Sequence, residues 1–178
     1  MNSALDEFKV TLIMVMSANG KVARKTVHNS FEWNSNEDQR QFLKRIRGIG
    51  TALMGSNTYR SIDQTPYEGV TLYVLSHHPD RLREHPAVHL VQGRVIDICR
   101  DIRDQGISHL ALLGGPDVNA QFFNYDLVDE IFLTVEPLLL DGGLNLVGEL
   151  EESVSLALNE VSLLGNGSSV LFHYVVEK

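Results

Sequence analysis

Residues 54–62 read MGSNTYRSI and continue a short apolar run that begins at Thr51. A glycine at the end of a buried strand lets the backbone approach a ligand closely. The N–H groups at the start of a following helix can bind phosphate. This order of strand, glycine turn and helix therefore predicts a nucleotide site, although the same residues could form a purely structural, capped turn.

A second turn of the same kind occupies residues 113–118, LGGPDV, after the apolar run at residues 109–113. It lacks the third glycine of the Rossmann fingerprint, and alone it could be a packing turn. In an open α/β sheet, ligands bind at the carboxyl ends of the strands, so two such turns fit one dinucleotide. The residues expected to hold it are Gly55, Ser56, Asn57, Thr58, Gly114, Gly115, Pro116, Asp117 and Val118.

A carboxylate pair lies between the first strand and these turns, in residues 33–38, WNSNED. The spacing predicts a helix over residues 36–47, capped by Ser35 or its neighbour, with an apolar stripe that includes Phe42. Asp38 lies one turn before Phe42, whereas Glu37 is nearer solvent. Burial raises the pKa of a carboxyl group, which suits a proton donor or relay. The alternative is that both carboxylates only complement the helix dipole.

Outward from these stretches, strands alternate with helices as far as residue 124, which implies a largely parallel sheet. The expected strands cover residues 10–16, 51–55, 71–76, 88–91 and 109–113, and the expected helices residues 36–47, 95–105 and 116–124. Three further strands, at residues 127–135, 154–164 and 169–176, have no helix between them. We therefore expect one α/β domain over residues 1–178, with a mixed, mainly parallel sheet of about eight strands. Its C-terminal edge should be antiparallel, and helices should cover both faces.

The composition of the chain argues against several kinds of partner and binding site. The net charge of −8 argues against nucleic acid as a partner, because phosphate backbones need a basic face. Cys99 is the only cysteine, which excludes an intrachain disulfide and a cysteine zinc site, and we expect it to be buried. Pro86 lies between His85 and His89, so we expect no metal site. No signal peptide or apolar span is evident, so we expect no membrane contact and a cytoplasmic location.

Taken in order, the motifs resemble those of the dihydrofolate reductase superfamily, most closely its riboflavin-biosynthesis reductase branch. The shared stretches are SANGKVA at residues 17–23, Trp33-Asn34 followed by Asp38, Met54-Gly55 with Thr58, Leu75-Ser76, Gly114-Gly115, VDE at residues 128–130, and Pro137 with Gly142-Gly143. The resemblance covers nearly the whole chain. It implies the three-layer dihydrofolate reductase-like fold.

The resemblance also implies an enzyme, an oxidoreductase that transfers a hydride from NADPH, with NADH not excluded, to a small pyrimidine- or pterin-like substrate. Asp38 would be the catalytic and substrate-anchoring carboxylate, and Trp33, Ser35 and Phe42 would bind substrate with it. Ser76 and His77 would join the two glycine turns around the cofactor. We also expect a homodimer, because such relatives pair and exposed edge strands need cover.

The departures from the family pattern bear on the substrate. Val70 stands where folate-binding members have an arginine, which disfavours dihydrofolate. Ser56 and Asp117 stand where many relatives have cations for the 2′-phosphate, so His77, His78, Arg60 or Arg81 would have to supply that charge. The chain lacks a deaminase zinc signature. The open alternatives are 5-amino-6-(5-phosphoribosylamino)uracil reductase with a separate deaminase, a related enzyme with another substrate, and a non-catalytic NADP-binding domain.

Overall fold

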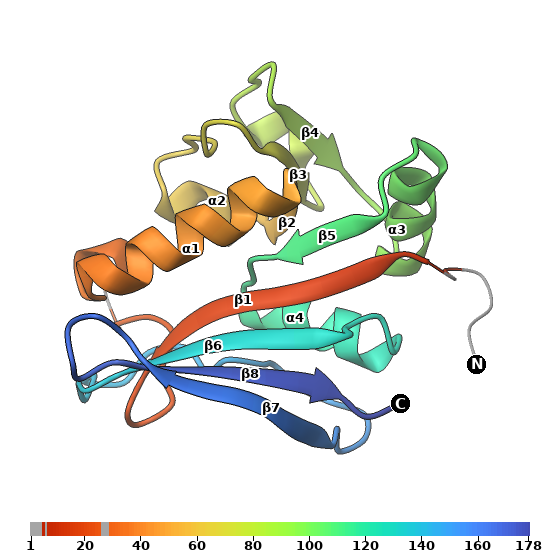
Figure 1. Ribbon diagram of the computed structural model, residues 1–178. Coiled ribbons are helices and arrows are strands. Elements are labelled where there is room, and N and C mark those ends of the chain that lie inside the picture. Colours follow the sequence, from red (N-terminus) through yellow and green to blue (C-terminus); the bar gives the residue numbers. More distant parts are fainter. Residues whose placement is uncertain (1–4, 6, 26–28) are drawn as a thin grey trace.

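The computed structural model describes residues 5, 7–25 and 29–178, and it has three layers around one sheet (Figure 1). The strands are β1 (Lys9–Ser17), β2 (Thr51–Gly55), β3 (Thr71–Leu75), β4 (Val88–Val91), β5 (His109–Leu112), β6 (Glu130–Glu136), β7 (Leu156–Leu163) and β8 (Val170–Val176). The helices are α1 (Asn36–Ile49), α2 (Ser56–Ser61), α3 (Val95–Asp104) and α4 (Pro116–Asn124), with short 3-10 turns η2 (Ser30–Glu32) and η3 (Pro79–Arg81).

The sheet has the order β4-β3-β2-β5-β1-β6-β8-β7. All neighbours from β4 to β6 are parallel, and β8 pairs antiparallel with both β6 and β7. The predicted mixed sheet with an antiparallel C-terminal edge is therefore confirmed. Parallel neighbours place the carboxyl ends of β1, β2, β3 and β5 at one edge, where the site lies.

Separate apolar clusters fill the two sides of the sheet. One contains Ile46 of α1 and Tyr59 of α2, and the other contains residues of α3 and α4, so helices cover both faces as expected (Figure 1). Cys99 is fully buried in the second cluster, where burial raises the pKa of its thiol to about 12. Among the described residues, no helix combines the length and apolar character needed to cross a membrane.

Three predicted boundaries were wrong by two or more residues, among them the start of β7, which is Leu156 and not residue 154. The strand expected from residue 127 begins at Glu130, because Leu127 and Val128 fill the core from the connection after α4 without joining the sheet. A run of apolar residues predicts that they are buried, but buried residues need not belong to a paired strand. Helix α1 continues two residues past the expected end, to Ile49, and stops at Gly50, whose φ of 81° favours glycine.

The two glycine turns lie against each other. The Gly55 amide donates a hydrogen bond to the Gly114 carbonyl oxygen at 2.7 Å. A Cβ atom on Gly55 would lie 2.9 Å from Val118 Cγ2, and one on Gly115 would lie 3.3 Å from Thr58 Oγ1. Side chains at these positions would therefore force the turns apart, which gives a physical reason for both glycines.

Candidate functional site

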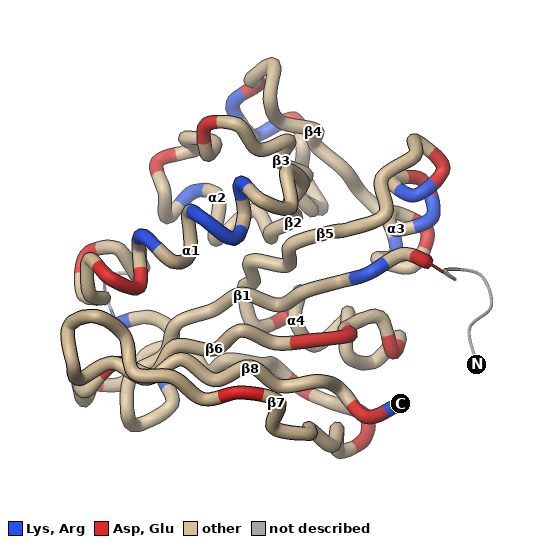
Figure 2. Tube along the Cα trace, viewed as in Figure 1, with Lys and Arg blue, Asp and Glu red and all other residues tan. Residues whose placement is uncertain are grey.

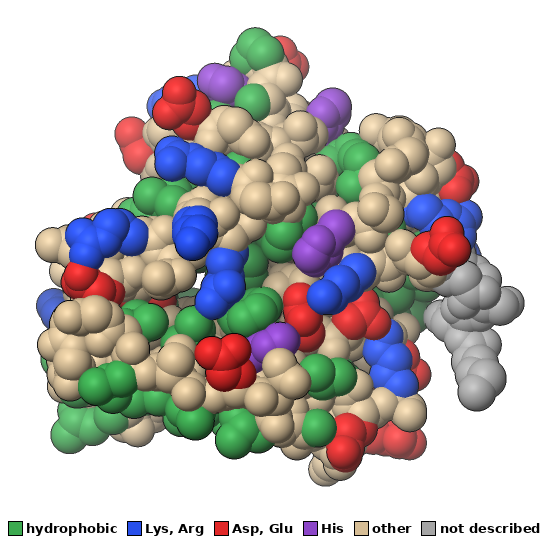
Figure 3. All heavy atoms as spheres, viewed as in Figure 1, with side chains coloured by type: hydrophobic (Ala, Val, Ile, Leu, Met, Phe, Trp, Pro, Cys, Tyr) green, Lys and Arg blue, Asp and Glu red, His purple; other side chains and the backbone are tan. Residues whose placement is uncertain are grey.

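A cleft of about 890 Å³ extends from the two glycine turns to the space between α1 and the sheet. Several basic residues lie along α1 (Figure 2), and hydrophobic side chains are visible in the hollow between this helix and the strands beside it (Figure 3). The volume falls in the range of cofactor and small-molecule sites. One cleft therefore joins the two sets of residues that the sequence singled out.

One end of the cleft is formed by most of the residues predicted to bind a cofactor. Those that line it are Gly55, Ser56, Asn57, Thr58, Ser76, His77, Gly115, Pro116, Asp117 and Val118. Gly114 lies behind them, where its carbonyl oxygen holds the β2 turn. Gly93, which follows β4, also lines this end, although sequence analysis did not select it.

Two of the four candidate cations for a 2′-phosphate reach this end, His77 and Arg60. The Arg60 guanidinium donates to Asn57 Oδ1 at 3.2 Å, which keeps it beside the turn. His78 and Arg81 belong to the segment around η3 and do not line the cleft. The cleft thus offers a cation and an imidazole to an anionic group, with the Asp117 side chain also on its wall.

Asp38 lies at the other end, on the first turn of α1, and is only 5% exposed. Asn34 Nδ2 donates to Asp38 Oδ2 at 2.6 Å, and Thr134 of β6 also hydrogen-bonds the carboxylate. Burial raises the pKa of Asp38 and the nearby charge of Glu136 adds to this, whereas the two hydrogen bonds and Arg45 oppose it. This is the direction predicted from the helix pattern, and it lets the carboxyl group keep a proton at higher pH.

The neighbouring carboxylate has a different environment, also as predicted. Glu37 does not line the cleft, and it forms an ion pair with Arg40 on the same helix. Adjacent helical residues diverge by about 100°, so only one of the pair can face the pocket. The choice between the two carboxylates could therefore be predicted from the apolar stripe of Phe42, Leu43 and Ile46.

Aromatic side chains form the wall beside Asp38. Phe42 packs edge-on against Phe31 and Tyr67, with ring centres 5.6 and 5.3 Å away, and all three line the cleft. Burial raises the pKa of the Tyr67 hydroxyl, so this residue acts as an uncharged wall. A planar heterocycle can pack between such rings and the sheet.

Trp33 and Ser35 lie beside the cleft and do not line it. Ser35 is the N-cap of α1, and its hydroxyl oxygen accepts a hydrogen bond from the Asp38 amide at 3.2 Å. The Trp33 indole Nε1 is buried without a hydrogen-bond partner within the described part of the chain. The structure thus gives Ser35 a supporting place behind Asp38.

Arg45, which was not predicted from the sequence, lies in the cleft with its guanidinium carbon 3.9 Å from the centre of the Phe132 ring. His173 stacks on the same ring at 4.2 Å, so the two groups occupy opposite faces of it. Arg45 follows Asp38 by seven residues, two helical turns, and that spacing could have revealed it. Across residues 5, 7–25 and 29–178, no carboxylate lies within ion-pair distance of Arg45.

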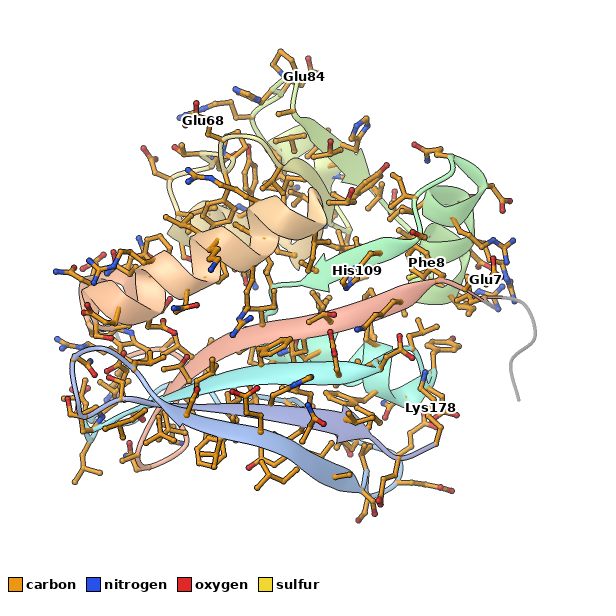
Figure 4. The ribbon with its side chains drawn as sticks, in the orientation of Figure 1. Glu7, Phe8, Glu68, Glu84, His109 and Lys178 are labelled. Carbon is orange, nitrogen blue, oxygen red and sulfur yellow. The ribbon has the colours of Figure 1, made fainter. Side chains whose placement is uncertain are left out.

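A polar network continues beyond Phe132 on the same face of the sheet. The Thr11 hydroxyl donates to Glu130 at 2.8 Å and lies 2.8 Å from His109 Nε2. Figure 4 labels His109 at the start of β5, the strand next to β1. Glu130 also pairs with Lys9 and His173, at 2.8 and 2.9 Å. Glu130 is thus already paired with other groups, although its charge and those of Glu160 and Asp38 still favour the charged form of Arg45.

Comparisons with known proteins identify a family and related proteins. A model of the RibD C-terminal domain family matches residues 8–170. A Bacillus subtilis (strain 168) protein, named "Uncharacterized protein YwjB", is 26% identical over 176 residues, which covers 95% of this chain and 98% of that one.

Two solved structures have the same fold. A putative riboflavin biosynthesis protein from Shewanella sp. PV-4 has a TM-score of 0.77 and 26% identity, and the match covers 96% of this chain and 100% of that one. Dihydrofolate reductase from Enterococcus faecalis, complexed with NADP(H) and RAB-propyl, has a TM-score of 0.73 and 17% identity, with 96% and 97% covered. The three-layer dihydrofolate reductase-like fold expected from the motifs is confirmed.

Proposed function

The chain belongs to the RibD C-terminal domain family, and from that premise we propose that it is an NADPH-dependent reductase of a small heterocycle with an anionic substituent. The observation that carries this proposal is the single cleft in which the glycine turns and the buried Asp38 face one space. The first substrate to test is 5-amino-6-(5-phosphoribosylamino)uracil.

The turn residues fit a nicotinamide dinucleotide, because Gly55 and Gly115 line the cleft as the N-caps of α2 and α4, and among the described residues no side chain caps the first N–H groups of either helix. Such a cofactor, when bound, supplies the hydride. His77 and Arg60 would hold a 2′-phosphate and favour NADPH, whereas Asp117 would weaken that preference. The role of the protein at this end is to bind and orient.

Asp38 would anchor and protonate the substrate ring. Its raised pKa lets it share or donate a proton, and Asn34 and Thr134 fix the orientation of its carboxyl group. Phe31, Phe42 and Tyr67 would exclude water from the ring. A general acid beside a hydride acceptor completes the reduction, because the heterocycle gains a hydride on one atom and a proton on another.

Arg45 would bind the anionic substituent. It is half-buried, burial lowers its pKa from the usual arginine value, and it faces the cleft beside Phe132. A guanidinium forms paired hydrogen bonds with phosphate or carboxylate. An uncharged substrate would leave this cation without such a partner in the cleft.

We expect Arg45→Ala to raise KM for a phosphorylated substrate by about 10- to 100-fold, because a lost charge-assisted hydrogen bond is worth about 1.5–3 kcal/mol. The NADPH dissociation constant should not change, since Arg45 lies away from the glycine turns. Arg47→Ala is the matched control, because Arg47 sits on the same helix and pairs with Glu68 outside the cleft. Equal KM values for both variants would contradict the assignment.

We further propose that the protein is a homodimer through the edge strand β7. A bulge between Leu158 and Glu160 shifts the alternation of side chains, which places the large apolar residues before and after it on one face. Those residues, with their exposed fractions, are Leu156 (42%), Leu158 (56%), Val161 (52%) and Leu163 (64%). In antiparallel self-pairing about the strand centre, Leu158 would face Val161 of the second copy. A long, exposed, apolar edge favours such association.

Sedimentation equilibrium should therefore give twice the chain mass of 19.9 kDa. Leu158→Lys should shift the protein to the single-chain mass, because a charge would then lie inside the pairing. Leu139→Lys is the control, since Leu139 is 73% exposed but lies outside the sheet. A wild-type protein that sediments at the single-chain mass contradicts the dimer.

The function itself is tested with a coupled assay. A separate deaminase supplies 5-amino-6-(5-phosphoribosylamino)uracil, and the absorbance of reduced nicotinamide reports its oxidation. Oxidation that requires this substrate supports the proposal. If the protein binds NADPH tightly but does not oxidise it in the presence of this or related heterocycles, a non-catalytic NADP-binding domain would be favoured instead.

A further inference from the structure

Glu136, the last residue of β6, is a carboxylate only 4% exposed, and within the described ranges no cation lies within ion-pair distance of it. Hydroxyl and amide donors hold it instead. The Ser35 amide and hydroxyl donate to Oε1 at 2.9 and 2.7 Å, and the Ser169 hydroxyl donates to Oε2 at 2.6 Å. A buried carboxylate without a cation is costly even when hydrogen-bonded, so its presence calls for a reason.

One set of bonds leads to the candidate catalytic group. The Ser35 hydroxyl has one proton, which it donates to Glu136, while its oxygen accepts the Asp38 amide at 3.2 Å. Ser35 is the N-cap that starts α1, and Asp38 lies in the first turn. Glu136 thus holds the residue that fixes both the beginning of the helix and the backbone of Asp38.

The other set leads to the turn between β7 and β8. Asn166 Nδ2 donates to Ser169 Oγ at 2.6 Å, and Asn166 Oδ1 accepts the Ser169 amide at 3.0 Å. A Cβ atom on Gly165 would lie 3.5 Å from Glu37 Cγ, so the turn packs against the first turn of α1. Figure 1 shows this hairpin turn beside the start of the helix.

We propose that Glu136 is a positioning residue of the site, which ties the first turn of α1 to β6 and to the β7–β8 turn and so fixes Asp38 in the cleft. The proposal deepens the reductase function and rests on it. The groups that act on the Asp38 carboxyl are Asn34 from its own segment, Thr134 and Glu136 from β6, and Arg45 from α1. Of these, Glu136 is the only one whose charge favours the protonated form.

The test is a titration of the Asp38 carboxyl by NMR, which needs no substrate. In Glu136→Gln, which keeps the shape and removes the charge, the Asp38 carboxyl should titrate at a lower pH than in the wild type. The pH profile of turnover should move in the same direction, with the NADPH dissociation constant unchanged. Glu37→Gln is the control, because Glu37 does not line the cleft and should leave the titration in place.

A lowered melting temperature with an unchanged Asp38 titration would show a merely structural role and would overturn the proposal. Absence of NADPH oxidation by the wild type would instead refute the reductase, so the two failures are distinct. If Glu136→Gln does not fold, Ser169→Ala removes the hydrogen bond between the β7–β8 turn and Glu136 while the Glu136 charge is kept. Exchange of the Asp38 amide hydrogen should then be about tenfold faster, and unchanged exchange would refute the coupling to the turn.

Discussion

Asp38→Asn should lower kcat by about 10²- to 10⁴-fold, the usual contribution of a positioned general acid. Asparagine keeps the size of the side chain but cannot donate a carboxyl proton. NADPH binding should be unchanged, because Asp38 lies at the opposite end of the cleft from the glycine turns. The measurement is single-turnover NADPH oxidation beside a fluorescence titration of the cofactor. Turnover at the wild-type rate would remove Asp38 from the mechanism.

The same substitution should stabilise the protein near neutral pH. The pKa of Asp38 is raised by burial above its usual value of 3.8, so the folded state binds this proton more tightly than the unfolded state. The stability it contributes is present below pH 3.8 and declines as pH rises towards the raised pKa. Asp38→Asn should lack this decline in denaturant titrations across that window, while Glu37→Gln should retain it. A parallel decline in both variants would contradict the raised pKa.

Gly143→Ala should lower the free energy of unfolding by about 2–5 kcal/mol. Gly143 has a φ of 101°, and a Cβ atom there would overlap the Ala23 carbonyl oxygen. The unfavourable backbone conformation costs about 1–2 kcal/mol, and the backbone movement needed to relieve the overlap adds about 1–3 kcal/mol. The substitution would also disturb the cleft, because Ala23 is one of the residues that line it. The Val22 amide next to Ala23 donates to the Leu144 carbonyl oxygen at 2.9 Å, so the two segments are joined there.

Gly142→Ala provides the matched control for this prediction. Gly142 has nearly the same φ, 104°, but no heavy atom lies within 4 Å of its would-be Cβ. Only the conformational cost remains, about 1–2 kcal/mol. Urea unfolding of both variants separates the two contributions. Equal losses of stability would show that the approach of Gly143 to Ala23 is not constrained as described.

The sequence predicted the layered α/β sheet because its strands are apolar runs that end at glycine turns. Residues 51–55 and 109–113 gave nearly the observed bounds of β2 and β5. The apolar Leu127 and Val128 misled the prediction of β6, since both are buried outside the sheet. Periodicity therefore located the elements well, but it did not separate strand pairing from burial in a loop.

The parts of the site that consist of residues close together in the sequence were also predictable. The glycine turns and Asp38 each lie at a helix start with a recognisable pattern. Glu136 was not found, because its partner Ser35 is 101 residues away in sequence and no spacing rule joins them. Ser35 was expected to touch substrate, yet its hydroxyl is committed to Glu136 and Asp38. Such tertiary hydrogen bonds appear only when the strands are in place.

We expect the cleft to bind a nicotinamide dinucleotide at the glycine turns. The most direct measurement is a titration of purified protein with NADPH and with NADH, followed by nicotinamide fluorescence, for the wild type and for Gly55→Val. The wild type should bind NADPH tightly, and Gly55→Val should bind it far more weakly, because its side chain would collide with Val118. Absence of binding to either nucleotide by the folded wild-type protein would refute a nicotinamide site at these turns.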